Sequence, residues 1–207
     1  MTATRTVIDL VEQFRATAVR GHVVDLLPYA DAHHTQVLAL RNLPRPMYFL
    51  HQPDLLTLAG QTRWFAGYLE RRDDIQWVIA RKDGTVLGAT ALYDIAADRS
   101  HADKGRLVID ESRSMEAPYV LEAELLLLDV AFARLGIARI DTCVRHDNAG
   151  MQSINARLGF TPGGSHDVRG VEYLDFSVTA EQHHPEALRR VAAAWAARTN
   201  RLTGVSV

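Results

Sequence analysis

The stretch DNAGMQSINARLGF, residues 147–160, decides the fold. Asn148 stands where a helix N-cap would, because its side chain can accept a hydrogen bond from a free backbone N–H of the first turn. Gly159 stands where helices commonly end in the left-handed conformation. Between them, three apolar residues share one face at helical spacing: Met151, Ile154 and Leu158. The stretch therefore predicts a short capped helix that packs on a core.

Hydrophobic periodicity outward from this helix predicts alternating helices and strands. The chain opens with a helical pattern, formed by Val7, Leu10, Val11, Phe14 and Ala18, that Gly21 stops. We expect further helices over residues 32–40, 57–71, 119–135 and 186–198, and strands over residues 22–29, 75–80, 85–95, 105–110, 137–144 and 171–178. Asp83-Gly84 predicts a hairpin turn. Residues 41–49 contain Pro44 and Pro46 and are expected to be irregular. This order predicts an α/β (α+β) protein with a mixed sheet in one domain.

Composition narrows the class of protein. The chain has 207 residues, with 23 Lys and Arg against 25 Asp and Glu, and 47% of its residues are hydrophobic. These values are typical of one soluble globular domain. The charge balance argues against a nucleic-acid or anionic-membrane binder, which would need a surplus of basic residues. The single cysteine, Cys143, excludes an internal disulfide. With no signal sequence and no apolar run near the ~20 residues of a membrane span, we expect a cytoplasmic protein.

Several common kinds of site are not indicated. The sequence contains neither a phosphate-binding loop of the Walker type nor a dinucleotide-binding glycine motif after a strand. The histidine pairs His33-His34 and His183-His184 are adjacent, and neighbours on a helix point ~100° apart, so we expect solvated histidines and no metal site. Cys143 lies in the middle of an expected strand and is interpreted as a buried structural thiol.

The order of elements between Asp103 and Phe160 resembles the core of the GNAT superfamily of acyl-CoA N-acyltransferases. The resemblance is carried by the capped helix described above and by residues upstream of it, and it covers about residues 23–178: Gln61, Trp64-Phe65, Gly88, residues 105–109, Asn148, Met151, Asn155 and Leu158-Gly159-Phe160. It implies a mostly antiparallel GNAT-like sheet flanked by helices. It also implies an acetyltransferase domain over residues 22–180, with helical extensions over residues 1–21 and 181–207.

The resemblance also implies a binding site for acetyl-CoA as co-substrate. A helix N-terminus after a strand offers unpaired N–H groups to a pyrophosphate. The family builds this cradle from Arg/Gln-x-x-Gly-x-Gly/Ala, and the equivalent run is Arg113-Ser114-Met115-Glu116-Ala117-Pro118. Glu116 replaces the first Gly, and Pro118, which has no N–H, replaces the last small residue. Either the Glu116 side chain points away from the cofactor, or CoA binds weakly, or CoA does not bind. The other residues expected to contact CoA are Val108, Ile109, Asp110, Asn148, Met151 and Asn155.

Acetyl transfer requires a deprotonated amine, a polarised thioester and a stabilised leaving thiolate. Asp103 lies where the family often has a Glu base, and its shorter side chain favours a water relay. His101 is the alternative base, because its ordinary pKa is ~6.5. Many members have a Tyr where this chain has Asn155, and an amide supplies no proton, so we expect the thiolate to leave unassisted. Backbone N–H groups of Ile109 or Asp110 would polarise the thioester.

The acceptor is expected to be bound by the first half of the chain. Cationic and aromatic residues gather there and could hold a phosphate and a stacked ring: Arg41, Arg45, Tyr48, Phe49, Trp64 and Tyr93. This segment is loosely similar to N-acetyltransferases of nucleotide-linked amino sugars and to acetyltransferases of the RimJ/RimL type. In the competing interpretation Trp64 and Phe49 are core residues and the arginines are solvated.

The sequence therefore predicts an N-acetyltransferase that acts on a primary amine of a small molecule, with no metal, nucleic acid or membrane as partner. Two alternatives stay open: a GNAT-like domain that has lost catalysis and serves in binding, and an enzyme that acetylates protein N-termini. The apolar stripe Leu188, Val191 and Trp195 on the last helix needs a cover, which predicts either packing on the domain or a homodimer.

Overall fold

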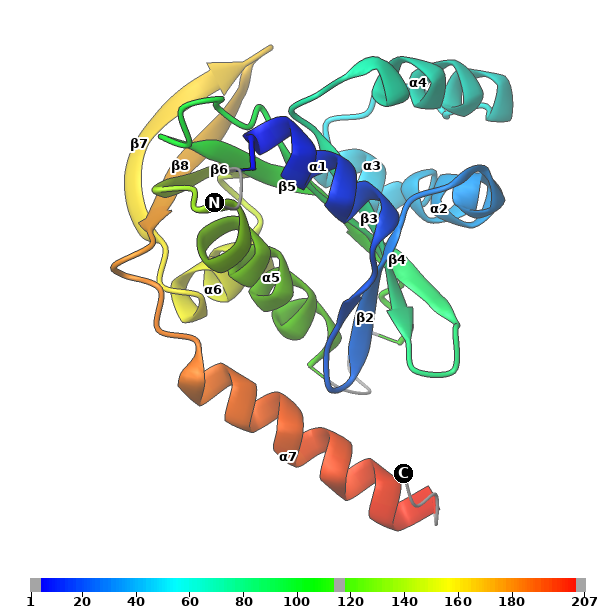
Figure 1. Cartoon of the computed structure of the whole chain (residues 1–207). Helices are drawn as coiled ribbons and strands as arrows, with labels where there is room; N and C mark the ends of the chain where they lie inside the picture. The colour runs from blue at the N-terminus through cyan, green and yellow to red at the C-terminus, as the bar shows by residue number, and fades with distance from the viewer. Residues whose placement is uncertain (1–4, 114–117, 204–207) are drawn as a thin grey trace.

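The computed structural model describes residues 5–113 and 118–203, without the side chains of residues 199–203. In this part of the chain eight strands form one sheet in the order β1-β2-β3-β4-β5-β6-β8-β7. Neighbouring strands are antiparallel except β5 and β6, which are parallel (Figure 1). The strands are β1 (Val19–Arg20), β2 (Val24–Pro28), β3 (Ile75–Arg81), β4 (Val86–Tyr93), β5 (Ala102–Ile109), β6 (Arg139–Arg145), β7 (Thr161–Val168) and β8 (Val171–Thr179). The expected mixed, mostly antiparallel sheet is confirmed.

Helices pack against both faces of this sheet (Figure 1). One face carries α1 (Val7–Ala16), α5 (Tyr119–Asp129) and α6 (Ala149–Arg157), and the other carries α2 (His34–Arg41) and α4 (Leu58–Glu70). The remaining helical segments are the 3₁₀ turn Asp31–His33, α3 (Pro44–Phe49), the π-helical segment Val130–Leu135 and α7 (Glu186–Thr203).

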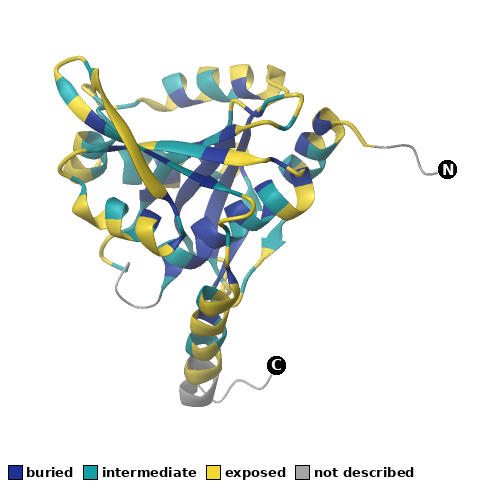
Figure 2. Ribbon diagram, turned by 90° about the vertical axis from the view of Figure 1, so that its left-hand side faces the viewer, coloured by how far each residue is buried: buried dark blue, intermediate teal, exposed yellow. Residues whose placement is uncertain are grey.

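The central strands are buried on both sides, which gives the domain two apolar cores (Figure 2). In β3, Ile75, Trp77 and Ile79 face the larger core under α1 and α5. Val78, between them, faces the smaller core, which contains Tyr29 and Val37. Because successive strand residues point to opposite faces, such a strand has an almost continuous apolar sequence.

The local signals around the opening motif are confirmed. Asn148 caps α6, where its Oδ1 accepts a hydrogen bond from Met151 N at 3.1 Å. Gly159 follows the helix with φ 90°, a conformation that glycine adopts without strain. The Asp83-Gly84 turn joins β3 to β4, and Arg81 N donates to Thr85 O at 2.8 Å.

Three expectations about the backbone are wrong. The segment with Pro44 and Pro46 forms helix α3, because the first turn of a helix has no acceptors for its own N–H groups and tolerates proline there. The first helix ends at Ala16, so Ala18 does not belong to its face. Strand β7 was not expected, since its sequence TPGGSHDV is polar and it lies exposed at the sheet edge.

The expectation of solvated histidines is wrong for His183, which lies just before α7. The His183 side chain is only 7% exposed, and its Nε2 lies 3.1 Å from Asp129 Oδ1. Arg189 NH2 donates to the same oxygen at 2.7 Å, so these contacts tie the start of α7 to the end of α5. His34 is buried as well and stacks on Tyr29.

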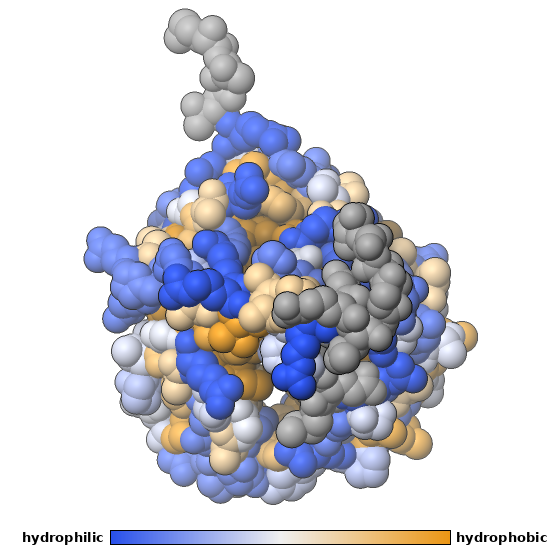
Figure 3. Space-filling view, turned by 90° about the horizontal axis from the view of Figure 1, so that it is seen from below, coloured by the Kyte–Doolittle hydropathy of each residue, from blue (hydrophilic) through white to orange (hydrophobic). Residues whose placement is uncertain are grey.

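Helix α7 runs away from the rest of the domain, and its last turns project from it (Figures 1 and 2). Leu188 packs against the larger core, whereas Val191 is 46% exposed. On the face of the molecule seen from below, apolar side chains line a recess bordered by hydrophilic ones (Figure 3). The homodimer stays a prediction, as do the domain boundaries after residues 21 and 180.

Candidate active site

The two parallel strands diverge and open a cleft in the middle of the sheet. β5 and β6 pair only at Ala102 with Ile140 and at Asp103 with Asp141. Beyond these pairs a cavity of about 670 Å³ is lined by residues 104–109 of β5 on one side and residues 142–145 of β6 on the other. A volume of this size is typical of a small-molecule site.

The open edge of β5 presents backbone groups to this cleft. Asp110 N donates to Leu87 O of β4 at 2.6 Å, so it is not available to a ligand, contrary to one of the two expectations. Because successive strand residues direct their N–H and C=O groups to opposite edges, the groups of Ile109 face the cleft instead. Gly88 on β4 permits this arrangement, since a Cβ there would lie only 2.0 Å from Val108 O.

A bulge in β5 directs Arg106 out of the regular strand pattern. The register between β4 and β5 shifts between Ala89 and Ala91, and Arg106 has φ 52°. A positive φ is strained for a residue with a side chain. Ion pairing to the buried Asp74 at 2.8 Å holds the arginine in place, and its guanidinium lies over the Tyr93 ring at 4.3 Å.

The first turn of α5 forms the wall of the cavity that would face an anion. Pro118, at the N-cap position, has no side-chain cap, and residues 118–121 line the cavity. The first turn of a helix carries a partial positive charge, which favours an anion beside it. Arg113 Nε lies 3.6 Å from Asp110 Oδ2. The remaining expected cradle residues, Ser114, Met115, Glu116 and Ala117, lie outside the described residues.

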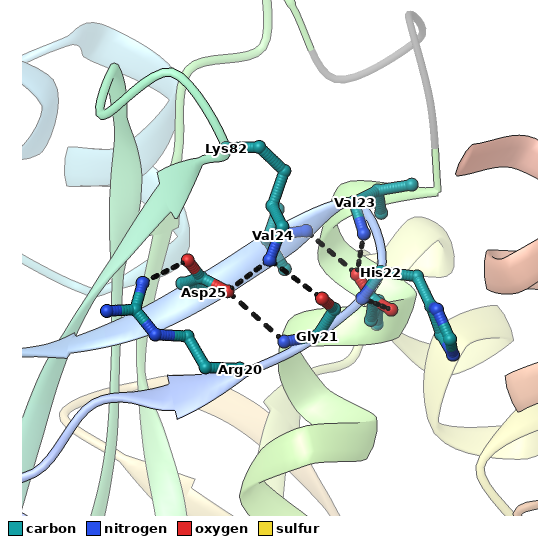
Figure 4. Close-up of polar contacts among 8 residues, drawn as sticks. Arg20, Gly21, His22, Val23, Val24, Asp25 and Lys82 are labelled. Carbon is teal, nitrogen blue, oxygen red and sulfur yellow. Dashed lines mark hydrogen bonds and ion pairs between the residues drawn. The ribbon is translucent and has the colours of Figure 1, made fainter. Parts of the chain in front are cut away.

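Glu122 anchors this first turn to the hairpin between β1 and β2, whose residues His22, Val23 and Val24 are labelled in Figure 4. Its carboxylate accepts hydrogen bonds from the backbone N–H groups of His22, Val23 and Val24, at 2.6, 2.6 and 2.8 Å. The turn passes so close that a Cβ on Gly21 would lie 2.5 Å from Val24 O and 2.9 Å from Glu122 Cδ. Glu122 therefore fixes the position at which α5 begins.

A second buried carboxylate of α5, that of Glu124, forms an ion pair at the closed end of the cleft. Glu124 Oε2 lies 2.7 Å from Lys104 Nζ, and Thr90 Oγ1 donates to Glu124 Oε1 at 2.7 Å. The side chains of the ion pair are 2% and 1% exposed. Lys104 is also the residue of β5 where the cavity lining begins. The ion pair thus fixes α5 against β4 and β5 at the root of the cleft.

The expected base Asp103 lies at this root, where it forms the last pair between β5 and β6 with Asp141. Burial raises its pKa, and the carboxylates of Asp94 and Asp141 raise it further. Tyr93 is opposite Asp103 on β4, and burial raises the pKa of its hydroxyl to about 12. Asp103 and Tyr93 are not among the residues that line the cavity, and neither is His101, which is exposed and contacts Ser100.

Cys143 is exposed and lines the cavity, which corrects the expectation of a buried thiol. It lies on β6, one of the two diverging strands. Partial enclosure raises the pKa of its thiol, and Asp175 and Asp103 add to this effect. The thiol therefore stays protonated at neutral pH and is a poor nucleophile.

At the end of the cavity near α3, aromatic and cationic side chains come together. Arg45 and Phe49, for which acceptor binding is a prediction, line it, and Arg45 Nε lies 2.9 Å from Glu111 Oε1. Tyr48 does not line it, and its ring lies 3.7 Å from the guanidinium carbon of Arg145. Arg145 and Tyr173 are among the lining residues that sequence reasoning missed. Both lie on strands of the second half of the chain, and no local signal connects them to α3.

The remaining expected site residues divide between the cavity and the protein interior. Val108, Ile109, Asn148 and Met151 line the cavity. Asn155 is 0% exposed and does not line it, and its side-chain oxygen and nitrogen have no hydrogen-bond partner among the described residues. Trp64 packs against the smaller core, and Arg41 lies beside a second cavity on that face of the sheet.

The described residues show neither a group of metal ligands nor a membrane-spanning helix. In residues 5–113 and 118–203, no three His, Cys, Asp or Glu side chains are grouped so that they could hold a metal ion. Within the same ranges, no helix has the length and apolar character needed to span a bilayer.

Comparison with known proteins gives one family and many similar folds. The sequence model described as an acetyltransferase (GNAT) domain matches residues 24–161. No curated protein matches the chain. Among solved structures, a GCN5-related N-acetyltransferase from Brucella melitensis superposes with a TM-score of 0.70 at 23% identity, covering 89% of this chain and 87% of that one.

Two other similar structures have more specific descriptions. An apo structure described as a nucleotide-linked sugar GNAT has a TM-score of 0.67 at 15% identity, covering 91% of this chain and 97% of that one. The spermidine N-acetyltransferase from Vibrio cholerae, in complex with CoA and spermine, has a TM-score of 0.70 at 13% identity, covering 77% and 96%. At these identities the likeness concerns the fold alone.

Proposed function

Since the chain belongs to the acetyltransferase (GNAT) domain family and is an acyltransferase, we propose that it transfers the acetyl group of acetyl-CoA to a primary amine of a small molecule. The observation that carries the proposal is the cleft between β5 and β6. Two strands of one sheet pair at two positions and then separate around a cavity of about 670 Å³. The edge of β5 in this cleft has no neighbouring strand and can pair with an extended ligand.

The walls of this cleft fit the chemistry of CoA. The backbone groups of Ile109, which face the cleft, suit the amides of a pantetheine arm, and the partial positive charge at the start of α5 suits a pyrophosphate. Apolar side chains of α5 and α6, including Leu121, Met151 and Ile154, line the space between them. When bound, acetyl-CoA supplies the acetyl group as a reactive thioester.

The residues at the root of the cleft can perform the proton transfer. Asp103, whose pKa is raised by burial, would accept a proton from the acceptor ammonium through a water molecule, because the carboxylate does not line the cavity itself. Asn155 does not reach the cavity, so the leaving thiolate would take its proton from solvent.

The charges at the acceptor end favour an acceptor with a negative group. Arg45, Arg106 and Arg145 line the cavity, and Glu111 is the one acidic residue among its described lining. Each arginine is paired with one carboxylate: Arg45 with Glu111, Arg106 with Asp74 and Arg145 with Asp147. The remaining N–H groups of these guanidinium groups can donate to a phosphate, whereas a polycation such as spermidine offers them no acceptor. The fold is also similar to that of the structure described as a nucleotide-linked sugar GNAT. The acceptor that we favour is therefore a nucleotide-linked amino sugar, which carries a negative group.

The test is release of free thiol from acetyl-CoA with a panel of amines. We expect turnover with a nucleotide-linked amino sugar and little with spermidine or with peptides that have a free N-terminus. Turnover with peptides alone would identify an enzyme of protein N-termini. Absence of thiol release with every amine, in a protein that binds CoA, would identify a binding domain without catalysis.

A further inference from the structure

A second cavity lies on the α2 and α4 face of the sheet, outside the cleft. It has a volume of about 10 Å³, and its polar lining comes from Tyr29, Arg41, Gln61, Gln76 and Arg106, with the Trp64 ring beside them. A space of this volume holds one particle of about the size of a water molecule. Arg106 also lines the large cavity, so the two spaces share one side chain.

Arg41 has no counter-charge among the described residues. Its Nε is buried and has no hydrogen-bond partner, although the residue as a whole is half-buried at the end of α2. Burial, and then the charge of Arg106, lower its pKa, which shows that its surroundings oppose the positive charge. A guanidinium nevertheless keeps its proton in proteins. The described residues thus leave the N–H of the buried Nε free to donate to an acceptor from outside the chain.

The carboxylate that pairs with Arg106 is already shared. Asp74 accepts from Arg71 NH1 at 2.7 Å and from Arg106 NH1 at 2.8 and 2.9 Å. None of the described residues that line the small cavity is acidic. One carboxylate thus serves two arginines, and the positive charge of Arg41 is in excess. A buried excess charge is unfavourable unless an opposite charge pairs with it.

The neutral groups of the cavity do not supply that charge. Gln61 Nε2 donates to Tyr29 Oη at 2.9 Å, and Gln76 Nε2 donates to Thr90 O at 3.0 Å. A water molecule could accept from Arg41 Nε, but it would leave the excess charge uncompensated. A whole phosphate or sulfate is too large for a space that holds one water-sized particle.

We propose that this cavity binds a small monovalent anion of halide size, held by Arg41 and Arg106. The bound anion joins the end of α2 to the bulge of β5 and keeps Arg106 in the position from which it faces the large cavity. The site rests on the geometry of Arg41 and is independent of acetyl transfer.

The test is thermal unfolding at constant ionic strength, with sodium gluconate replaced stepwise by sodium chloride. Gluconate is too bulky for the cavity, and an anion that binds only the folded state raises Tm in a saturable way. We expect an increase of about 2 °C or more for the wild type. Arg41→Met should show no increase, and its Tm in gluconate should equal or exceed that of the wild type because the excess charge is gone.

Arg45→Met is the matched control, since Arg45 lies one turn further along the chain and is paired with Glu111. It should keep the response to chloride. Crystals grown in sodium bromide give a second readout that does not depend on any variant, and we expect anomalous density beside Arg41 Nε. An equal chloride response in wild type and Arg41→Met, or density for water alone in the cavity, would overturn the proposal. Neither readout uses acetyl-CoA, so the result is separate from that of the amine panel.

Discussion

Asp103→Asn is expected to lower kcat/KM for acetyl transfer by about 10²- to 10⁴-fold, the range for loss of a general base. The carboxylate lies at the root of the cleft, where burial and the charges of Asp94 and Asp141 raise its pKa. A raised pKa brings a carboxyl group closer to the optimum for accepting a proton near neutral pH. Initial rates against acceptor concentration, at saturating acetyl-CoA, measure the effect.

The same substitution should stabilise the protein at neutral pH. A carboxyl group with a raised pKa in the folded state favours folding fully below its unfolded pKa of about 3.9, and this contribution is lost as the pH rises through the folded value. Asn carries no charge at any pH. Melting curves of Asp103→Asn and wild type should therefore converge near pH 3 and separate at pH 7, with the variant more stable.

Asp94→Asn is the matched control for both readouts. Asp94 is exposed, and Asn tolerates its positive φ of 50°. Removal of this charge should lower the pKa of Asp103, so the acid limb of the pH–rate profile should move to lower pH with kcat largely kept. A variant Asp103→Asn with normal kcat would exclude Asp103 as the base and make His101 the next candidate.

The largest effect on stability is expected at the buried ion pair of Lys104 and Glu124. Lys104→Met leaves Glu124 buried without its partner, and breaking such a pair costs about 3–5 kcal/mol. Urea unfolding of Lys104→Met and of the double variant Lys104→Met/Glu124→Leu measures it. The double variant should recover much of the loss, because no uncompensated charge remains.

Lys82→Met gives the comparison with a partly exposed pair. Lys82 Nζ lies 2.6 Å from Asp25 Oδ1, but its side chain is 47% exposed. Pairs of this kind contribute about 0–1 kcal/mol, so the variant should unfold close to wild type. Equal losses in the free energy of unfolding for Lys104→Met and Lys82→Met would show that the buried pair has no special role in holding α5.

The sequence predicts those parts of the fold that are determined by interactions between residues close together in the chain. Asn148 and Gly159 mark the two ends of α6 through hydrogen bonding and backbone conformation within a few residues. Pro44 and Pro46 led to the wrong prediction of an irregular segment. The effect of a proline on helix stability depends on its position in the helix, and the residue type alone does not give that position. β7 is polar and exposed, so it has none of the alternation that identifies a strand.

The site was predictable only in part, since it is assembled from distant segments. Val108, Ile109, Asn148 and Met151 were found because they belong to runs with a recognisable order, and they line the cavity. Arg145 and Tyr173 reach it from strands that the sequence does not connect with α3. Lys104 and Glu124 are charged and look like surface residues, and only the pairing of β5 with α5 explains their burial.

Binding of CoA tests the central claim that the cleft between β5 and β6 is the cofactor site. Gly150 lines this cavity, and a Cβ added there meets Asn148 Oδ1 only at 3.8 Å, so Gly150→Trp should fold and fill the cavity. Calorimetric titration with CoA should give saturable one-to-one binding for the wild type and none for Gly150→Trp. No binding to the wild type at millimolar CoA, or equal binding to both proteins, would contradict the account.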